Sequence, residues 1–252
     1  MELPTTKNLL NSKLFQILKK VIEESNIESY IIGGFVRDFL LNKKKSKDID
    51  IVCVGSGIDL AKALKKTVSN STKIQIFKNY GTAMFTWNDI VLEFVGARKE
   101  SYSTESRNPN IEIGSLEDDQ NRRDFTINTL AISLNPSNFG KIIDPFNGIK
   151  DLKNNVLKTP LDPDKTFSDD PLRMLRGIRF ATQLNFTIEK KSYRSISKNS
   201  DRIKIISKER IVEELNKIIS SQKPSIGFMI LDQTGLLNHI LPEIQNLKGV
   251  EE

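Results

Sequence analysis

The chain is poor in the two residue types that carry most nucleophilic and metal-site chemistry. Its 252 residues include one cysteine, Cys53, and one histidine, His239. A single cysteine excludes an internal disulfide and any cysteine-rich zinc site, and it is typical of a reducing compartment. A single histidine argues against Ser-His-Asp, Cys-His and multi-histidine metal sites. Any chemistry must therefore use carboxylates, arginines, lysines and hydroxyls.

Long apolar runs are also missing. No stretch approaches the ~20 apolar residues of a membrane span, and residues 1–20 hold no apolar segment long enough for a signal peptide. We therefore expect a cytoplasmic protein with no membrane partner. The excess of basic residues is mild, since 38 Lys+Arg against 32 Asp+Glu gives +6. That surplus permits an anionic partner without requiring one.

Hydrophobic spacing predicts two regions of different character. The first mixes helices with strands, which we expect over residues 14–22, 35–41 and 58–68 (helices) and 30–32, 48–54, 73–77, 82–87 and 90–95 (strands). The second has helical periodicity over residues 170–184, 207–220 and 224–232. We therefore expect an α+β fold, with a small mixed β-sheet domain over 1–140 and an all-helical domain over 141–252. Residues 98–119, rich in Ser, Asn, Pro, Glu and Asp, predict a structureless functional or disordered loop.

A glycine turn followed by two carboxylates forms the first candidate site. In Gly33–Asp38 (GGFVRD), the Gly33-Gly34 pair lets backbone N–H groups approach a phosphate, although such a pair is more often only a turn. Asp48 and Asp50 lie two residues apart on a predicted strand and so share a face. A divalent cation would relieve their repulsion, and Mg²⁺ takes one or two carboxylates plus substrate phosphates. The alternative is a solvated strand edge; the glycine turn ahead of the pair favours the metal.

A third carboxylate, Glu93, lies on the strand predicted over 90–95. If that strand neighbours residues 48–54, Glu93 could complete the metal site or act as a base. It could equally be an outward-facing polar residue.

Paired arginines open the second cluster, Arg122–Asn128 (RRDFTIN). Guanidinium forks match phosphate oxygens, so Arg122 and Arg123 suit a triphosphate. The alternative is a surface ion pair with Glu117, Asp118 or Asp119, which would contribute little to stability.

The third cluster is the helix predicted within Asp169–Phe180 (DDPLRMLRGIRF). Its first turn holds an acidic N-cap candidate and a proline. Its apolar face holds Met174, Leu175, Ile178 and Ala181, whereas the opposite side carries Arg173, Arg176 and Arg179 with only Asp170 as a nearby helical counter-charge. Uncompensated arginines favour an anionic ligand; the alternative is a solvated basic face. Asp170 and Arg173, at i and i+3, could read the edge of a nucleobase or form a plain ion pair.

Three other features have plainer interpretations. His239 and Cys53 are interpreted as structural. The basic run over Lys43–Lys47 is typical of a solvated loop, which beside a polyphosphate site could steer the substrate electrostatically.

Together these segments resemble the class II CCA-adding tRNA nucleotidyltransferases and the bacterial poly(A) polymerases that share their catalytic head. Five motifs match in order over about residues 30–241. They are Gly33–Asp38 with Asp48–Asp50, Arg122–Asn128, Asp144–Gly148 (DPFNG) with Asp151-Leu152, Asp169–Phe180, and Ser207–Ile211 (SKERI). The family has Glu-Asp where this chain has Asp169-Asp170, which leaves the second Asp in place.

The resemblance implies a nucleotidyltransferase head followed by a helical neck, and CCA addition to tRNA 3′ ends from CTP and ATP. It implies that Asp48 and Asp50 bind Mg²⁺, as two ions, and that Gly34, Arg37 and Arg123 contact the nucleotide. Asp170 and Arg173 would pair with the base edge. Arg176 and Arg179 would contact phosphate or ribose. The partner is then RNA, not DNA.

The same resemblance leaves alternatives open. Poly(A) synthesis, or addition of CC or A alone, belongs to the same class, and a non-catalytic RNA-binding module is the alternative from another class. Family members usually continue past the neck into body and tail domains, so we expect this chain to be part of a longer protein.

Overall fold

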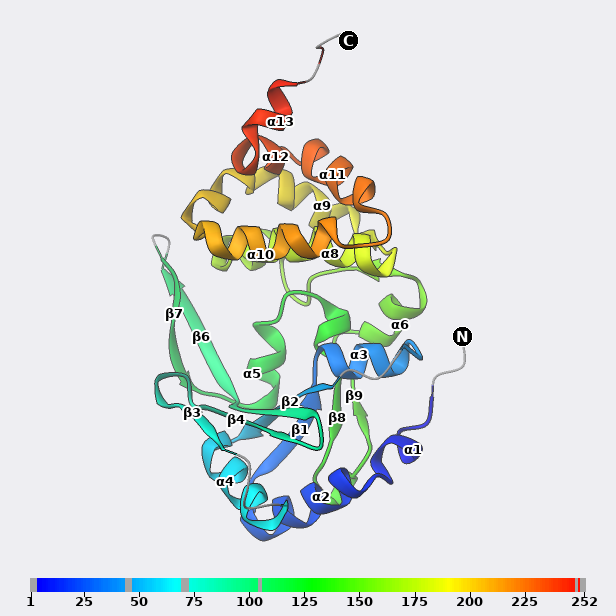
Figure 1. The fold of residues 1–252 in the computed structure, drawn as a ribbon, viewed down its shortest axis with the longest axis vertical. Helices are drawn as coiled ribbons and strands as arrows, with labels where there is room; N and C mark the ends of the chain where they lie inside the picture. The colour runs from blue at the N-terminus through cyan, green and yellow to red at the C-terminus, as the bar shows by residue number, and fades with distance from the viewer. Residues whose placement is uncertain (1–3, 44–46, 69–72, 104–105, 248, 250–252) are drawn as a thin grey trace. The chain divides into compact units, whose positions relative to one another are not determined.

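The computed structural model describes residues 4–43, 47–68, 73–103, 106–247 and 249 (Figure 1). The chain divides into two compact units. The N-terminal unit holds residues 1–100, 111–123 and 127–149, and the helical unit holds 101–110, 124–126 and 150–252. The short segment 124–126 therefore packs with the helical unit, although both of its neighbours in the sequence belong to the N-terminal unit.

A seven-stranded sheet organises the N-terminal unit, in the order β3-β4-β5-β2-β1-β8-β9. Its strands are β1 (Glu28–Ile32), β2 (Asp48–Val54), β3 (Gln75–Phe77), β4 (Thr82–Trp87), β5 (Ile90–Gly96), β8 (Ala131–Ser133) and β9 (Ile142–Ile143). β2 and β5 run parallel and the other neighbours antiparallel. Asn88 and Asp89 form the turn between β4 and β5 at φ 47° and 61°, a conformation that asparagine and aspartate tolerate. The predicted mixed sheet and α+β class are confirmed.

α4 (Gly57–Val68), with α2 (Lys13–Ser25) packed against it, covers one face of this sheet. The other helices of the unit are α1 (Thr6–Leu10), α3 (Gly34–Leu40) and α5 (Leu116–Asn121), followed by α6 (Gly148–Lys153). α4 packs on β2, β4 and β5 and against α2. Ile49 and Ile51 of β2 and Leu92 and Phe94 of β5 are buried. The alternate residues of these two strands, which carry the carboxylates, point to the other face.

α8 (Leu172–Leu184) is central to the helical unit, where it packs against α7 (Pro163–Asp169), α10 (Lys208–Ile219) and α11 (Pro224–Gln233). The remaining helices are α9 (Lys190–Lys198), α12 (Leu236–Ile240) and α13 (Pro242–Asn246). The 3₁₀ turns of the whole chain are η1 (Lys78–Tyr80), η2 (Thr126–Asn128), η3 (Pro136–Asn138) and η4 (Ser200–Ile205).

The expectation of an all-helical second half is wrong in one detail. β10 (Val156–Leu157) and β11 (Thr187–Ile188) pair in parallel. Two residues are too few to produce the alternating pattern by which strands are predicted. The helix expected from Asp170 begins instead at Leu172, because Asp170 and Pro171 form the corner between α7 and α8.

The expectation of a structureless segment over 98–119 is also wrong. β6 (Arg98–Ser103) and β7 (Ser106–Ile113) form a two-stranded sheet, and α5 follows. Ser115 and Asp118 form a capping box at the start of α5, the arrangement that satisfies two backbone donors reciprocally. The pairing of β6 with β7 depends on backbone hydrogen bonds, which a polar sequence makes as readily as an apolar one. The sequence therefore shows no hydrophobic alternation there.

Candidate active site

Three carboxylates lie on the face of the sheet opposite α4. Asp48 is exposed and Asp50 half-buried on β2, while Glu93 on β5 stands directly opposite Asp50 in the parallel register. Residues opposite one another in neighbouring strands share a face and are close in space. The structure therefore brings Glu93 to the predicted pair, which sequence alone left undecided.

The pKa values of Asp50 and Glu93 are both raised, first by burial and then by neighbouring carboxylates. Burial raises the pKa of Asp50; Arg123 opposes that shift, whereas Asp48 and Asp119 add to it. Burial and the neighbouring Asp50 raise the pKa of Glu93 against the opposing charge of Arg98. Carboxylates in this state gain most from a cation.

The donor set fits a hard divalent ion that keeps substrate oxygens in its coordination sphere. Within the part of the chain that the structure describes, no three His, Cys, Asp or Glu side chains converge closely enough to hold a metal by themselves. Mg²⁺ does not need such a cage, because it commonly binds through one or two carboxylates plus phosphates and water.

Gly33 leaves the space beside these carboxylates open. Its φ of +82° is a conformation that glycine adopts at low cost. A Cβ there would lie 3.0 Å from Nη1 of Arg123 and 3.7 Å from Oδ2 of Asp50. Gly33, Arg123 and Asp50, which lie far apart in the sequence, therefore meet at one point, and Gly34 begins α3 next to it.

Arg37 is buried, and all three nitrogens of its guanidinium group donate hydrogen bonds to protein side chains. It is 8% exposed. Its Nε and Nη2 donate to the two carboxylate oxygens of Asp38 at 2.8 and 2.9 Å, and its Nη1 donates to Oδ1 of Asn128 at 2.9 Å. These contacts connect the GGFVRD and RRDFTIN motifs. Asp38 and Asn128 belong to the predicted motifs, but sequence reasoning gave them no role.

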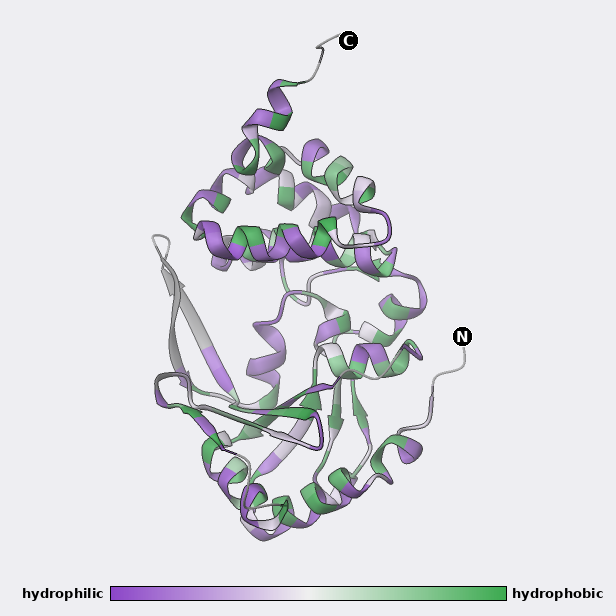
Figure 2. Ribbon diagram, in the orientation of Figure 1, coloured by the Kyte–Doolittle hydropathy of each residue, from purple (hydrophilic) through white to green (hydrophobic). Residues whose placement is uncertain are grey.

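The two arginines of the second motif share one buried acid. Asp119 of α5 is fully buried, accepts from Nε of Arg122 at 2.9 Å and Nε of Arg123 at 3.0 Å, and contacts an Nη2 group of each arginine. Burial alone would raise the pKa of Asp119, but Arg123 and Arg122 outweigh it and hold the pKa below its ordinary value. The ion-pair alternative is thus realised with Asp119, in the protein interior. It also places Arg123 beside Gly33. Figure 2 shows α5 as hydrophilic along most of its length, so hydropathy gave no sign of this burial.

The DPFNG motif has a structural role in this fold. Asp144 accepts from the backbone N–H groups of Gly148 at 2.6 Å and Ile149 at 3.0 Å. Asn147 takes a left-handed conformation with φ 58°. Asp144 thereby satisfies two otherwise unpaired donors at the start of α6.

In the helical unit, Asp170 and Arg173 are neighbours at the α7–α8 corner. Oδ1 of Asp170 accepts from the backbone N–H of Leu172 at 3.2 Å. Arg173 is 8% exposed, and its Nη1 donates to the carbonyl of Thr166 at 3.3 Å. These contacts fix the orientation of both side chains on the corner.

Two arginines of α8 have counter-charges from outside their own helix. Arg176 donates to Asp124 at 2.7 Å, and Nε of Arg179 lies 2.7 Å from Oε2 of Glu214 on α10. The guanidinium groups of both arginines also lie over the ring of Phe180. Asp124 raises the pKa of Arg176. Both acids lie far from their partners in the sequence, so helical spacing could not indicate them.

Phe125 and Asp124 together fasten segment 124–126 to α8. The Phe125 ring is fully buried, meets Phe180 edge-on at 6.1 Å and lies against Gly177, where a Cβ would approach Cζ of Phe125 to 2.8 Å. Thr126 continues the attachment by donating to Asp151 at 2.7 Å.

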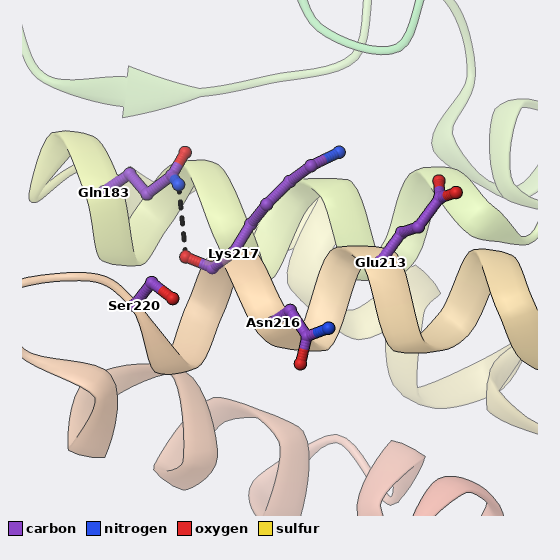
Figure 3. Close-up of a pocket in the computed structure, with 5 residues that line it drawn as sticks. All are labelled: Gln183, Glu213, Asn216, Lys217 and Ser220. Atoms are coloured by element: carbon purple, nitrogen blue, oxygen red, sulfur yellow. Dashed lines mark hydrogen bonds between the residues drawn. The ribbon is translucent and has the colours of Figure 1, made fainter.

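The helical unit also has an open hollow of about 410 Å³ between α8 and α10 (Figure 3). Gln183 of α8 donates there to the carbonyl of Lys217 at 3.2 Å. Glu213, Asn216, Lys217 and Ser220 of α10 complete the lining. None of the predicted site residues lies in it.

Residues 44–46 of the basic run lie outside the described residues.

Comparison with known proteins agrees with this arrangement of motifs. Residues 29–158, just over half of the chain, match the Poly A polymerase head domain. The chain belongs to this family. Residues 185–248 match a second domain, the probable RNA and SrmB-binding site of polymerase A. The resemblance inferred from the motifs is thus confirmed.

Relatives in this family are similar over most of the chain. The A-adding tRNA nucleotidyltransferase of Aquifex aeolicus (strain VF5) is 38% identical over 75% of this chain and 23% of its own length. The CCA-adding enzyme of Lactobacillus helveticus (strain DPC 4571) is 35% identical over 86% of this chain and 52% of its own. A solved tRNA nucleotidyltransferase complexed with a primer tRNA and an incoming ATP analog superposes with a TM-score of 0.77 at 30% identity. That match covers 93% of this chain and 64% of the solved one.

The chain therefore spans about half or less of the length of these curated relatives. Among the helices that the structure describes, none is long and apolar enough to cross a membrane.

Proposed function

We propose that this chain carries the catalytic part of a template-independent RNA nucleotidyltransferase that adds CCA to tRNA 3′ ends from CTP and ATP. The observation that carries the proposal is that Asp48, Asp50 and Glu93 lie together on one sheet face, beside Gly33 and Arg123. The names of the relatives point to the same chemistry. The predicted division into a head over 1–140 and a neck over 141–252, and a cytoplasmic location, are part of this proposal.

In the proposed reaction the RNA 3′-hydroxyl attacks the α-phosphorus of a nucleoside triphosphate. A new P–O bond forms to the ribose, the bond to the β-phosphate oxygen breaks, and pyrophosphate leaves. Asp48 and Asp50 would hold Mg²⁺, as two ions, which when bound activate the hydroxyl and stabilise the leaving oxygens. Glu93, which stands directly opposite Asp50, would either complete that ligand set or accept the hydroxyl proton.

The arginine and glycine groups position the triphosphate. Arg123, held by Asp119, supplies a fixed positive charge next to Asp50. Fixed donors at developing charge lower the barrier without reorganising during the reaction. Because Gly33 and Gly34 have no side chains, their backbone leaves space for the phosphates. Arg37 secures the turn through Asp38 and Asn128, and in this proposal it also contributes positive potential to the phosphates.

Base selection is proposed for Asp170 and Arg173 of the helical unit. The Asp170 carboxylate offers hydrogen-bond acceptors, and the Arg173 guanidinium offers a planar fork of donors. This combination suits the edges of cytosine and adenine. Phosphate or ribose contacts by Arg176 and Arg179 stay predictions. Because these two side chains pair with Asp124 and Glu214, we propose that they chiefly hold α8 in place.

One alternative within the class is favoured by a specific observation. The Aquifex aeolicus relative is named as A-adding, so addition of the terminal A alone is the second candidate. Poly(A) synthesis and a non-catalytic RNA-binding role are the remaining alternatives.

One incorporation assay separates these functions. The protein is incubated with Mg²⁺, CTP and ATP and with tRNA ending before CCA, or with tRNA already ending in CC. Ordered addition of C, C and A to the first tRNA supports the proposal. Addition of A to the second tRNA alone identifies an A-adding enzyme, a long A tail identifies a poly(A) polymerase, and no incorporation leaves the non-catalytic role.

A further inference from the structure

The sheet face that carries the carboxylates extends beyond them to the edge strand β3. Asp50, Glu93, Met84 and Gln75 stand opposite one another across β2, β5, β4 and β3. They therefore form one row on one face. Three strand spacings make this row about 14 Å long. β3 is the edge strand, at the end of the sheet far from β9 (Figure 1).

Two aromatic side chains are exposed at that edge. Phe77 stands opposite Thr82, in the row next to the one that holds Glu93 and on the same face. Its side chain is 43% exposed, and that of Tyr80, in the η1 turn that follows, is 62% exposed. Neither residue belongs to the buried core, and both are among the most exposed large apolar side chains of the N-terminal unit.

The charge around these rings is of one sign. Lys73 and Lys78 are exposed on either side of Phe77. Residues 73–88, which include Phe77 and Tyr80, contain no Asp or Glu. Exposed aromatic rings flanked by lysines are the pattern by which proteins hold single-stranded nucleic acid, with bases stacked on rings and phosphates near the cations.

We propose that Phe77 and Tyr80 form a base-stacking platform for the single-stranded 3′ segment of the acceptor RNA, with Lys73 and Lys78 beside its phosphates. This inference rests on the proposed function for the identity of the RNA as acceptor. The shared sheet face would let a strand whose 3′-hydroxyl lies at the carboxylates continue toward β3. The other possible occupant is a second copy of this chain pairing with the β3 edge, and the test includes it.

The test measures RNA affinity by fluorescence anisotropy with a short, labelled, single-stranded oligoribonucleotide ending in CC. F77A and Y80A should each weaken binding by about 5- to 150-fold, because base stacking contributes about 1–3 kcal/mol per ring. F77Y and Y80F keep the rings and should bind as the wild type does. I76A and M229A, which remove exposed apolar side chains outside the platform, are the matched controls and should also leave affinity unchanged.

The lysines are tested through salt dependence. K73Q/K78Q should reduce the slope of log affinity against log salt concentration by about 1.4, the value for two lost phosphate contacts on a single strand. An unchanged slope would show that the two lysines do not face the RNA and would overturn that part of the proposal.

Two further measurements separate this proposal from the proposed function. D50N should abolish incorporation, and in the D50N background F77A/Y80A should weaken oligoribonucleotide affinity by the same factor as in the wild type. If the wild type incorporates nucleotides but F77A/Y80A binds RNA equally tightly, the platform is wrong and the function stands. If the affinity loss occurs but the wild type incorporates nothing, the platform stands and the function fails. A dimer in sedimentation velocity that F77A/Y80A dissociates, with RNA affinity unaltered, would assign the edge to a second copy and overturn the platform.

Discussion

At the scale of single residues, the candidate site brings like charges together at a cost that a cation would relieve. Burial and neighbouring carboxylates raise the pKa of Asp50 and Glu93. Replacing Asp48 and Asp50 by Asn should therefore lower incorporation by roughly 10²–10³-fold or more, the effect of removing a preorganised electrostatic group. The thermal midpoint should stay the same or rise. D59N, which changes an exposed carboxylate on α4, is the control, and retained activity in D48N/D50N would refute the metal assignment.

Arg173 allows the role of base selection to be separated from a structural one. R173A should reduce discrimination of CTP and ATP against UTP and GTP by about 10- to 100-fold, since a bidentate base contact contributes about 1–3 kcal/mol. Competition between nucleotides in the incorporation assay measures this ratio. R173K retains the charge but not the fork, so it should lose selection nearly as fully. Unchanged discrimination in both variants, with only a lower thermal midpoint, would make Arg173 a purely structural residue.

Asp119 predicts a specific dependence of stability on pH. Its pKa is depressed in the folded state, so it stabilises the fold at pH values above its unfolded pKa, and this contribution is lost as the pH falls through the folded pKa. D119N should lower the free energy of unfolding by about 3–5 kcal/mol at neutral pH, because it leaves Arg122 and Arg123 without their buried partner. Urea titrations at several pH values should show this difference constant from neutral pH down to about pH 5, and shrinking below about pH 4. A difference independent of pH would exclude the ion pair as its cause.

At the scale of helices and strands, the sequence predicts elements whose apolar residues are regularly spaced. It does not predict polar elements, or contacts between residues that lie far apart in the sequence. The strand Asp48–Val54 and the helix over 172–184 follow from the alternation and spacing of their apolar residues. Residues 98–113, which form β6 and β7, are mostly polar, so their sequence indicates a loop. The partners of Arg176 and Arg179 come from other segments, so a helix examined alone looks uncompensated. The buried acid that positions Arg123 lies on α5, a short polar helix.

Substitution of Gly177 tests how closely α8 packs against segment 124–126. Alanine in a helix interior is favoured over glycine by about 1 kcal/mol. G177A should nevertheless destabilise the protein by about 1–3 kcal/mol, because its Cβ would lie 2.8 Å from Cζ of Phe125. A smaller side chain at Phe125 should suppress part of this loss, so the double-mutant cycle of G177A with F125L should show a favourable coupling. Q183A, on the exposed side of the same helix, is the control. A stabilised G177A would contradict the packing described.

At the scale of the whole molecule, the two units are not two consecutive lengths of chain. Residues 124–126 pack with the helical unit and are flanked in sequence by Arg123 and by residues 127–149 of the N-terminal unit. A fragment ending at residue 149 would keep the complete seven-stranded sheet but would leave Phe125 without Gly177 and Phe180. We expect this fragment to fold, to expose Phe125, and to bind a hydrophobic dye more strongly than the full chain. Dye fluorescence and sedimentation velocity measure this exposure. F125S should reduce the dye binding of the fragment while destabilising the full chain, because the same ring is exposed in one and buried in the other. Equal dye binding by the fragment and its F125S variant would mean that Phe125 finds another cover within the N-terminal unit.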